Sequence, residues 1–163
     1  GTYEEFLEVY DPEANDATEM LCAGLINRDP EAREKISNDM LDRGADATVV
    51  DYGQNTLTLL LSHDDLGDGD PALVQRLVEA GADVNYRESH GDTPIKLAVK
   101  IGAESDEQRR PIYEALFGKD VDLDEPSNVR NPKNKIGEWL RMCVDHQPEG
   151  LKVLDEFLTA RGF

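Results

Sequence analysis

The stretch whose side chains most resemble a catalytic or metal-binding site is residues 62–71, SHDDLGDGDP, where one histidine and four aspartates surround two glycines. Oxygen-rich loops can bind calcium, and an EF-hand loop needs oxygen ligands at positions 1, 3 and 5, glycine at 6 and glutamate at 12. Counted from Asp64, position 3 is Leu66, and counted from Asp68, position 6 is Leu73. Both registers fail, so we expect no metal site here, with weak and unspecific cation binding left open as the alternative.

The histidines and cysteines give no catalytic or metal-binding pattern. His63, His90 and His146 are far apart in the sequence and fall in different segments. Cys22 and Cys143 are also widely separated and fit no metal-ligand spacing. The sequence holds no glycine-rich phosphate loop, nucleophile elbow or zinc motif. We therefore expect a protein that is not an enzyme, with no catalytic residue, no metal and no cofactor.

The charge of the chain narrows the classes of partner. It holds 17 Lys and Arg against 35 Asp and Glu, a net charge of −18, and the acidic excess lies before residue 130. Such a surface repels phosphate backbones, so we expect no nucleic-acid partner. No apolar run is long enough to span a membrane. The acidic start of the chain is unlike a secretory signal, and two distant cysteines are typical of reduced thiols, so we expect a cytoplasmic monomer.

The residues that mark the ends and starts of the predicted helices recur every 37 residues, and these helices must position any functional site. Gly44, Gly81 and Gly118 are spaced by this step, and so are Thr56 and Thr93. Gly44 and Gly81 each follow an amphipathic segment and suit the position just after a helix, where left-handed backbone angles favour glycine. Each threonine suits the N-cap of the following helix. The period therefore predicts a unit made of an extended turn, which we term a finger, and two helices.

The same local signals predict where the helices begin and end. Asp29 before Pro30 marks one helix start, and we expect Asp70 to cap another. The residues in excess of a 33-residue unit fall at 62–70 and 102–110, so we expect these two loops to stack on one side of the array. The predicted helices are 17–27, 30–43, 57–62, 71–80, 94–102, 111–117, 135–145 and 148–161, with a short helix over 4–10 at the start.

Two motifs give this unit a resemblance to a known family. The stretch GDTPIKLA, residues 91–98, matches the signature T-P-L-H-x-A, and LVEAGADVN, residues 77–85, matches the ending of the same unit. This chain therefore resembles the ankyrin repeat family from Pro30 to about Leu123. Two departures stand out. Lys96 replaces the histidine that usually bonds the finger backbone in that family, and the unit after Asp122 keeps none of the signature.

The resemblance implies an all-α fold, an ankyrin-repeat solenoid of about four helix pairs with short β-hairpin-like fingers and divergent terminal caps. We expect a single domain over residues 1–163. Residues 1–43 would form an N-terminal helix and a capping helix pair, residues 44–123 two recognisable repeats, and residues 124–163 a divergent C-terminal capping repeat. Trp139 is expected to pack inside that cap.

The resemblance also implies a function, because the concave face of such arrays binds other proteins. We expect a non-enzymatic protein–protein interaction module that binds a protein partner through its fingers and first helices. Tyr52 and Tyr86 are expected to form a ladder across adjacent fingers, or else to pack only against the neighbouring finger. The predicted partner-binding residues are Val50, Tyr52, Gln54, Tyr86, Arg87, Ser89, His90, Lys96 and Lys100.

A second function remains open on the charge alone. The protein would be an acidic inhibitor or immunity-type factor that neutralises a basic protein partner. Its association with such a partner should slow steeply as the salt concentration rises, because salt screens long-range attraction.

Overall fold

A computed structural model describes residues 17–163 as a mostly helical chain, which confirms the all-α class. The predicted helix over residues 4–10 lies outside the described residues. The elements are α2 (Ala17–Leu25), α3 (Pro30–Asp42), β1 (Val50–Asp51), β2 (Gln54–Asn55), α4 (Thr56–Leu60), α5 (Asp70–Glu79), α6 (Pro94–Lys100), α7 (Asp106–Gly118), α8 (Ile136–His146) and α9 (Lys152–Ala160).

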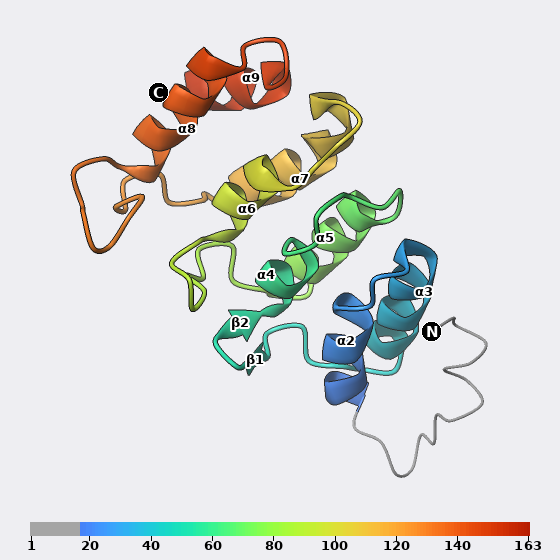
Figure 1. Cartoon of the computed structure of the whole chain (residues 1–163). Coiled ribbons are helices and arrows are strands. Elements are labelled where there is room, and N and C mark those ends of the chain that lie inside the picture. The colour runs from blue at the N-terminus through green and yellow to red at the C-terminus, as the bar shows by residue number, and fades with distance from the viewer. Residues whose placement is uncertain (1–16) are drawn as a thin grey trace.

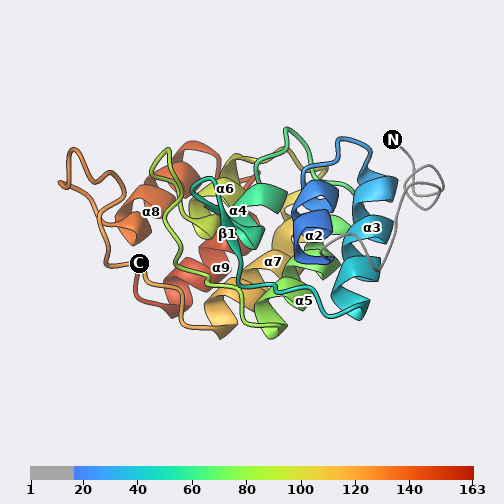
Figure 2. The same cartoon turned by 90° about the horizontal axis from the view of Figure 1, so that it is seen from below.

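The helices stack in pairs in the order of the chain, from α2 and α3 at one end to α8 and α9 at the other (Figure 1). Seen from below, α2, α4 and α6 lie in one layer and α3, α5, α7 and α9 in a second (Figure 2). The core lies between the layers, where side chains such as Leu21, Leu57, Leu77, Ile95 and Leu154 are fully buried. Each such leucine contributes about 1.5–3 kcal/mol by leaving water. Over residues 17–163, no helix is long and apolar enough to cross a membrane.

Four helices of the second layer end in the same way. A residue with positive φ follows the helix, and the next N–H bonds the carbonyl five residues back, which satisfies carbonyls that the helix end leaves free. The predicted roles of Gly44 and Gly81 are confirmed, with φ of 90° and 103°. Gly118, which continues the 37-residue spacing, is instead the last residue of α7, and Asp120, with φ of 51°, takes the left-handed position after that helix. These N–H to carbonyl bonds are Ala45 to Met40, Ala82 to Leu77, Val121 to Leu116 and Phe163 to Leu158.

The helix starts differ in part from the prediction. Asn55, and not Thr56, caps α4: its side chain accepts a hydrogen bond from the Thr58 N–H, and the Thr58 hydroxyl accepts one from the Asn55 N–H. Thr56 instead donates its hydroxyl to the Ala47 carbonyl. Thr93 precedes α6 as predicted, but in the described residues its hydroxyl has no hydrogen-bond partner. The predicted start of α3, with the Asp29 side chain as its cap, is confirmed.

One buried carboxylate explains why α7 starts earlier and α9 later than predicted. Oδ1 of Asp106 accepts hydrogen bonds from the Tyr113 hydroxyl at 2.7 Å and from Arg109 at 3.2 Å, which fixes the first two turns of α7. Its Oδ2 accepts from the backbone N–H groups of Val153 and Leu154 at 2.8 and 2.9 Å. The carboxylate therefore caps α9 from another helix pair, a contact that no local sequence signal reveals.

Asp70 does not cap α5, because it is the first residue of that helix and Gly69 precedes it. Its carboxylate is buried and pairs with Arg33 through two hydrogen bonds, of 3.0 Å to Nε and 2.7 Å to Nη2. It also accepts the Gly67 N–H at 2.8 Å. We name residues 62–71 the acidic loop, and Asp70 is its last aspartate. Asp70 therefore joins α5 to α3 and also closes the loop on itself.

The acidic loop lies against the next loop of the same kind, as the sequence predicted. The Leu66 N–H donates to the Gly102 carbonyl and the Gly102 N–H donates to the Asp64 carbonyl, both at 2.8 Å. The side chains of Asp64, Asp65 and Asp68 remain exposed. The loop is thus a structural connection with three aspartates on its outside.

Candidate functional site

The first finger, residues 50–55, is a two-residue hairpin that projects from the stack (Figure 1). Val50 pairs with Asn55 and Asp51 with Gln54, which leaves Tyr52 and Gly53 as the turn. Their φ angles are 50° and 76°. Turns with two consecutive positive φ values match the twist of a hairpin and favour Asn-Gly. A tyrosine therefore occupies a position where its backbone is disfavoured, and its side chain is 95% exposed.

The second finger, residues 86–92, uses a different turn. The Gly91 N–H donates to the Glu88 carbonyl and the Glu88 N–H to the Asp92 carbonyl, both at 2.8 Å, and Gly91 has a φ of 92°. This is a three-residue loop with glycine in the left-handed position. The Ser89 N–H donates to the Gly53 carbonyl at 3.0 Å, so the tips of the first two fingers are hydrogen-bonded to each other.

Glu88 is the buried anion that holds the first two fingers together. Its carboxylate accepts hydrogen bonds from Gln54 Nε2 at 3.0 Å and from the Asp92 N–H at 2.8 Å, and it lies 3.0 Å from His90 Nδ1. Burial of the carboxyl raises its pKa, but these hydrogen bonds outweigh burial and lower the pKa of Glu88 below its ordinary value. The group is therefore held as a carboxylate.

The third finger, residues 124–135, is bound to the second finger by Arg87 and to α6 by Lys96. Arg87 donates to the carbonyls of Gly91 at 2.9 Å and Pro126 at 2.6 Å. Lys96, which the sequence predicted to face a partner, is instead buried and donates its ammonium to the Ser127 carbonyl. Burial lowers the pKa of Lys96, partly opposed by the nearby Asp92 carboxylate. Lys96 thus bonds a finger backbone even though it replaces the histidine that the resemblance led us to expect at this position.

Trp139 of α8 lies beneath the two lysines of α6. The Lys96 ammonium is 5.0 Å and the Lys100 ammonium 5.8 Å from the centre of the indole ring, within the range of cation–π attraction. Lys100 also donates to both oxygens of Asp92 at 3.0 and 3.1 Å. Trp139 is partly buried against the core, as expected, and in addition it positions these two cations.

The fingers and the helices beneath them enclose two adjoining hollows, which together we name the finger groove. The first lies between the first finger with α4 and the second finger with α6, and Ile26, Leu59 and Leu97 form its apolar wall. The second, of about 730 Å³, lies between the second and third fingers. Both hollows are lined by Glu88, His90, Asp92 and Lys100, so the second finger is the ridge that separates them.

Six of the nine predicted partner-binding residues line this groove. Gln54 lies in the first hollow, and Arg87 and Ser89 in the second. Tyr52 lies at the tip of the first finger and Val50 at the start of β1, and both line a separate hollow beside α2 rather than the groove. Among the nine residues, Val50, Tyr52, Ser89, His90 and Lys100 are exposed, Gln54, Tyr86 and Arg87 are half-buried, and Lys96 is buried.

The predicted tyrosine ladder is wrong in register. The Tyr86 N–H donates to the Asp83 carbonyl, and the Val49 N–H donates to the Asp46 carbonyl in the same way. Tyr86 therefore corresponds to Val49 at the base of the finger, while the tip bearing Tyr52 adjoins Ser89 of the second finger. The two tyrosines are 34 residues apart, whereas equivalent positions in the first two fingers are 37 residues apart. This difference of three residues places Tyr52 at the tip of its finger and Tyr86 at the base of the next one.

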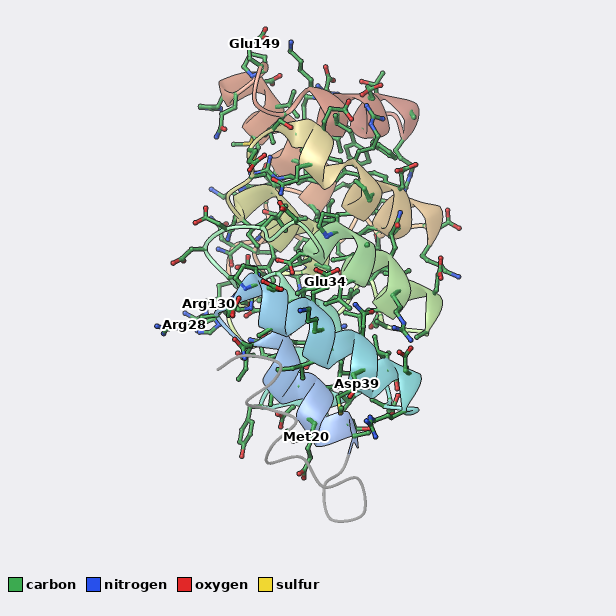
Figure 3. The ribbon with its side chains drawn as sticks, turned by 90° about the vertical axis from the view of Figure 1, so that its right-hand side faces the viewer. Met20, Arg28, Glu34, Asp39, Arg130 and Glu149 are labelled. Atoms are coloured by element: carbon green, nitrogen blue, oxygen red, sulfur yellow. The ribbon has the colours of Figure 1, made fainter. Side chains whose placement is uncertain are left out.

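Sequence reasoning missed the contribution of the third finger. Val129 and Arg130 line the second hollow, and both are exposed. Figure 3 shows the Arg130 side chain extending away from the ribbon. Ile26, at the end of α2, is 55% exposed and lines the first hollow. No motif marks these residues, because the third finger lies where the recognisable signature has ended.

Residues 17–163 contain no group of three or more His, Cys, Asp or Glu side chains that could hold a metal ion. Comparison with protein-family models finds no match. Comparison with curated proteins also finds none. Among solved structures, the chain is similar to the crystal structure of a functionally unknown protein from Leptotrichia buccalis C-1013-b, with a TM-score of 0.75 and 22% sequence identity, over 100% of this chain and 91% of that one. At this identity the likeness shows a shared fold alone.

Proposed function

We propose that the chain is a divergent ankyrin-repeat array. Three structurally matched segments support this: 44–46, 81–83 and 120–122, separated by 37 and 39 residues. Each begins with a left-handed residue after a helix and ends with an aspartate. Each aspartate side chain accepts the N–H two residues further on, all at 2.9 Å, and a finger follows. A common local geometry under different sequences is what divergence of one repeating unit would produce.

We infer that the function is non-enzymatic binding of a protein partner along the finger groove, and Tyr52 is the observation that carries this proposal. A left-handed backbone costs a residue with a side chain roughly 1–2 kcal/mol, which glycine or asparagine largely avoids. An exposed tyrosine ring gains nothing from burial in return. Neither conformation nor packing accounts for Tyr52, whereas tyrosine is among the residues that anchor protein interfaces.

The groove has the mixed surface that an extended polypeptide requires. One hollow has an apolar wall and the other is lined by charged side chains. Ile26, Val50 and Val129 are each more than half exposed, and they lie at the end of α2 and on the first and third fingers. Ile26 and Val129 line the groove and Val50 lies beside it, and apolar side chains spread in this way suit a segment that alternates apolar and polar contacts.

Replacing Tyr52 by asparagine tests the proposal, because it separates binding from stability. Tyr52→Asn places Asn-Gly in the turn and should raise the free energy of unfolding, by up to about 1 kcal/mol. The same change should reduce capture of the partner from extracts of the source organism. A variant that is more stable and still captures the partner fully would refute the role of Tyr52.

Photo-crosslinking identifies the face that binds. A benzoylphenylalanine at Tyr52, His90 or Val129 should crosslink the partner. The same group at Glu79 or Lys119, exposed residues at the ends of α5 and α7 that lie outside both the fingers and the groove, is the matched control. Equal crosslinking from both sets would overturn the assignment of the groove.

The second candidate, an acidic inhibitor of a basic protein, is favoured by the exposed side chains of Asp64, Asp65 and Asp68 on one loop. Here the acidic loop would form the main contact, although Asp64 also lines the first hollow of the groove. Changing all three to asparagine should slow association at low salt and leave the fold intact. An association rate that does not respond to salt would exclude this candidate.

A further inference from the structure

The second hollow has a charge opposite to that of the molecule as a whole. Among the described residues that line it, Arg87, Lys96, Lys100 and Arg130 are cationic, and Glu88 and Asp92 are anionic. The whole chain, by contrast, holds 17 basic and 35 acidic side chains. Because the protein walls of a hollow focus the field of its net charge, this excess acts more strongly on a ligand inside the hollow than it would on an open surface.

The cations of the hollow are only partly neutralised. Arg87 donates to two backbone carbonyls, which carry no full charge. One carboxylate, Asp92, serves both Lys96, at 3.4 Å, and Lys100. Glu88 is already committed to Gln54, His90 and a backbone N–H. Burial is the main cause that lowers the pKa of Lys96, and the positive charges of Lys100 and Arg87 lower it further.

Two of the cations, Lys100 and Arg130, are accessible to a ligand that enters the hollow. The Lys100 side chain is 49% exposed, and Arg130 is exposed on the third finger with no ion pair in the described part of the chain. Val129 beside it is 57% exposed. A carboxylate that entered here could accept hydrogen bonds from lysine and arginine together, which are shorter and stronger than those between neutral groups.

We propose that the second hollow of the finger groove binds a glutamate- or aspartate-bearing segment of the protein partner. This rests on the function proposed above and names the chemistry of the partner at one end of the groove. The carboxylates lie between Lys100 and Arg130, and the apolar side chains of the same segment extend toward Leu97 and Leu59. A nucleic acid is a poor alternative occupant, because its backbone carries charge along its whole length and the acidic loops beside the groove would repel it.

The test uses two labelled dodecapeptides, one of alternating glutamate and alanine and one of alternating glutamine and alanine. Fluorescence anisotropy at low salt should show binding of the glutamate peptide only, weakening as sodium chloride is raised. In the variant carrying Lys100→Glu and Arg130→Glu, affinity for the glutamate peptide should fall at least about tenfold. No binding of the glutamate peptide, or equal binding of both peptides, would overturn the proposal.

A control variant carries the same change of net charge elsewhere. Lys119→Glu with Lys152→Glu alters exposed lysines that do not line the hollow, and it should retain most of the affinity. Equal loss in both variants would show that only the overall field matters and would refute a site. Because Lys100 contacts Asp92, Arg130→Glu alone, with its circular dichroism spectrum, provides a variant that breaks no ion pair seen in residues 17–163. A single-stranded oligothymidylate that binds more tightly than the glutamate peptide would also contradict the proposal.

The two proposals fail in different ways. If Tyr52 crosslinks a partner and that partner still binds the Lys100→Glu, Arg130→Glu variant, the acidic segment is refuted and the binding function stands. If the glutamate peptide binds but no protein is crosslinked from any finger, the binding function is refuted, and with it the assignment of the hollow to a protein partner.

Discussion

Asparagine at position 70 gives the sharpest test of how the acidic loop is held. The side chains of Arg33 and Asp70 are 2% and 1% exposed, and two hydrogen bonds join them. Asp70→Asn keeps the size of the side chain and removes its charge, which leaves the Arg33 guanidinium buried without a counter-ion. Breaking a buried pair in this way costs about 3–5 kcal/mol. We expect the lower end, because the amide oxygen can still accept one hydrogen bond.

Urea unfolding followed by circular dichroism measures the loss, with the free energy extrapolated linearly to water. A loss of about 3 kcal/mol in a chain of this length lowers the melting temperature by roughly 6–12 °C. Asp68→Asn, an exposed change in the same loop, is the matched control and should stay within about 0.5 kcal/mol of the wild type. A loss below about 1 kcal/mol for Asp70→Asn would show that the pair is hydrated in solution and would refute the reasoning.

A double variant tests whether the ion pair itself, or the hydrogen bonds that its side chains make to the backbone, holds the loop. Arg33→Met combined with Asp70→Leu removes both ions and fills similar volume with apolar atoms, an exchange that is often neutral or stabilising. Arg33 also donates to the Asn27 carbonyl and Asp70 accepts from Gly67, so some destabilisation should remain. The double variant should nevertheless be more stable than Asp70→Asn alone. The reverse order would mean that the hydrogen bonds to the backbone, and not the ion pair, hold the loop.

Two further predictions concern backbone strain and pH. Asp120→Gly should stabilise the protein by up to about 1 kcal/mol, and Gly81→Ala should destabilise it by about 1–2 kcal/mol, because both positions have positive φ. Thermal unfolding of the two variants measures these changes. A change in stability of the same sign in both variants would contradict the prediction. The pKa of Glu88 is lower in the folded protein than its usual value near 4.5, so the stability that Glu88 contributes is present above that pH and is lost as the pH falls through the folded value. Glu88→Gln should therefore unfold with a flatter acid limb below about pH 4.5 than the wild type, and identical acid limbs would show that another carboxylate dominates.

Local signals were enough to predict most of the helices. Asp29 followed by Pro30, and the glycines at 44 and 81, mark helix ends through interactions among neighbouring residues, and the structure confirms them. The errors arose where a more distant residue competes with the local signal. The first residue of α5 was predicted to be a cap, but Asp70 is bound by Arg33, which lies 37 residues earlier. Asp106 has the same effect on α9 from 47 residues away.

The candidate site was predicted only in part for a related reason. A finger can be recognised from its turn residues, but the height at which a side chain emerges depends on the register between neighbouring fingers. The bond from Ser89 to Gly53 sets that register, and it excludes a ladder of Tyr52 with Tyr86. Lys96 was placed on the correct helix, yet it is buried because the third finger offers the Ser127 carbonyl at its end.

The sequence by itself determined the helical class, the 37-residue step and the absence of a recognisable calcium or zinc motif, because each follows from residues close together in the chain. Only the tertiary structure decided what the charges do. In the folded protein, Asp70 of the acidic loop forms a buried ion pair with Arg33. The fold also brings four cationic side chains together in one hollow of an acidic protein: Arg87, Lys96, Lys100 and Arg130. The physical reason is that electrostatic energies depend on distance and burial, and neither can be read from positions along the chain.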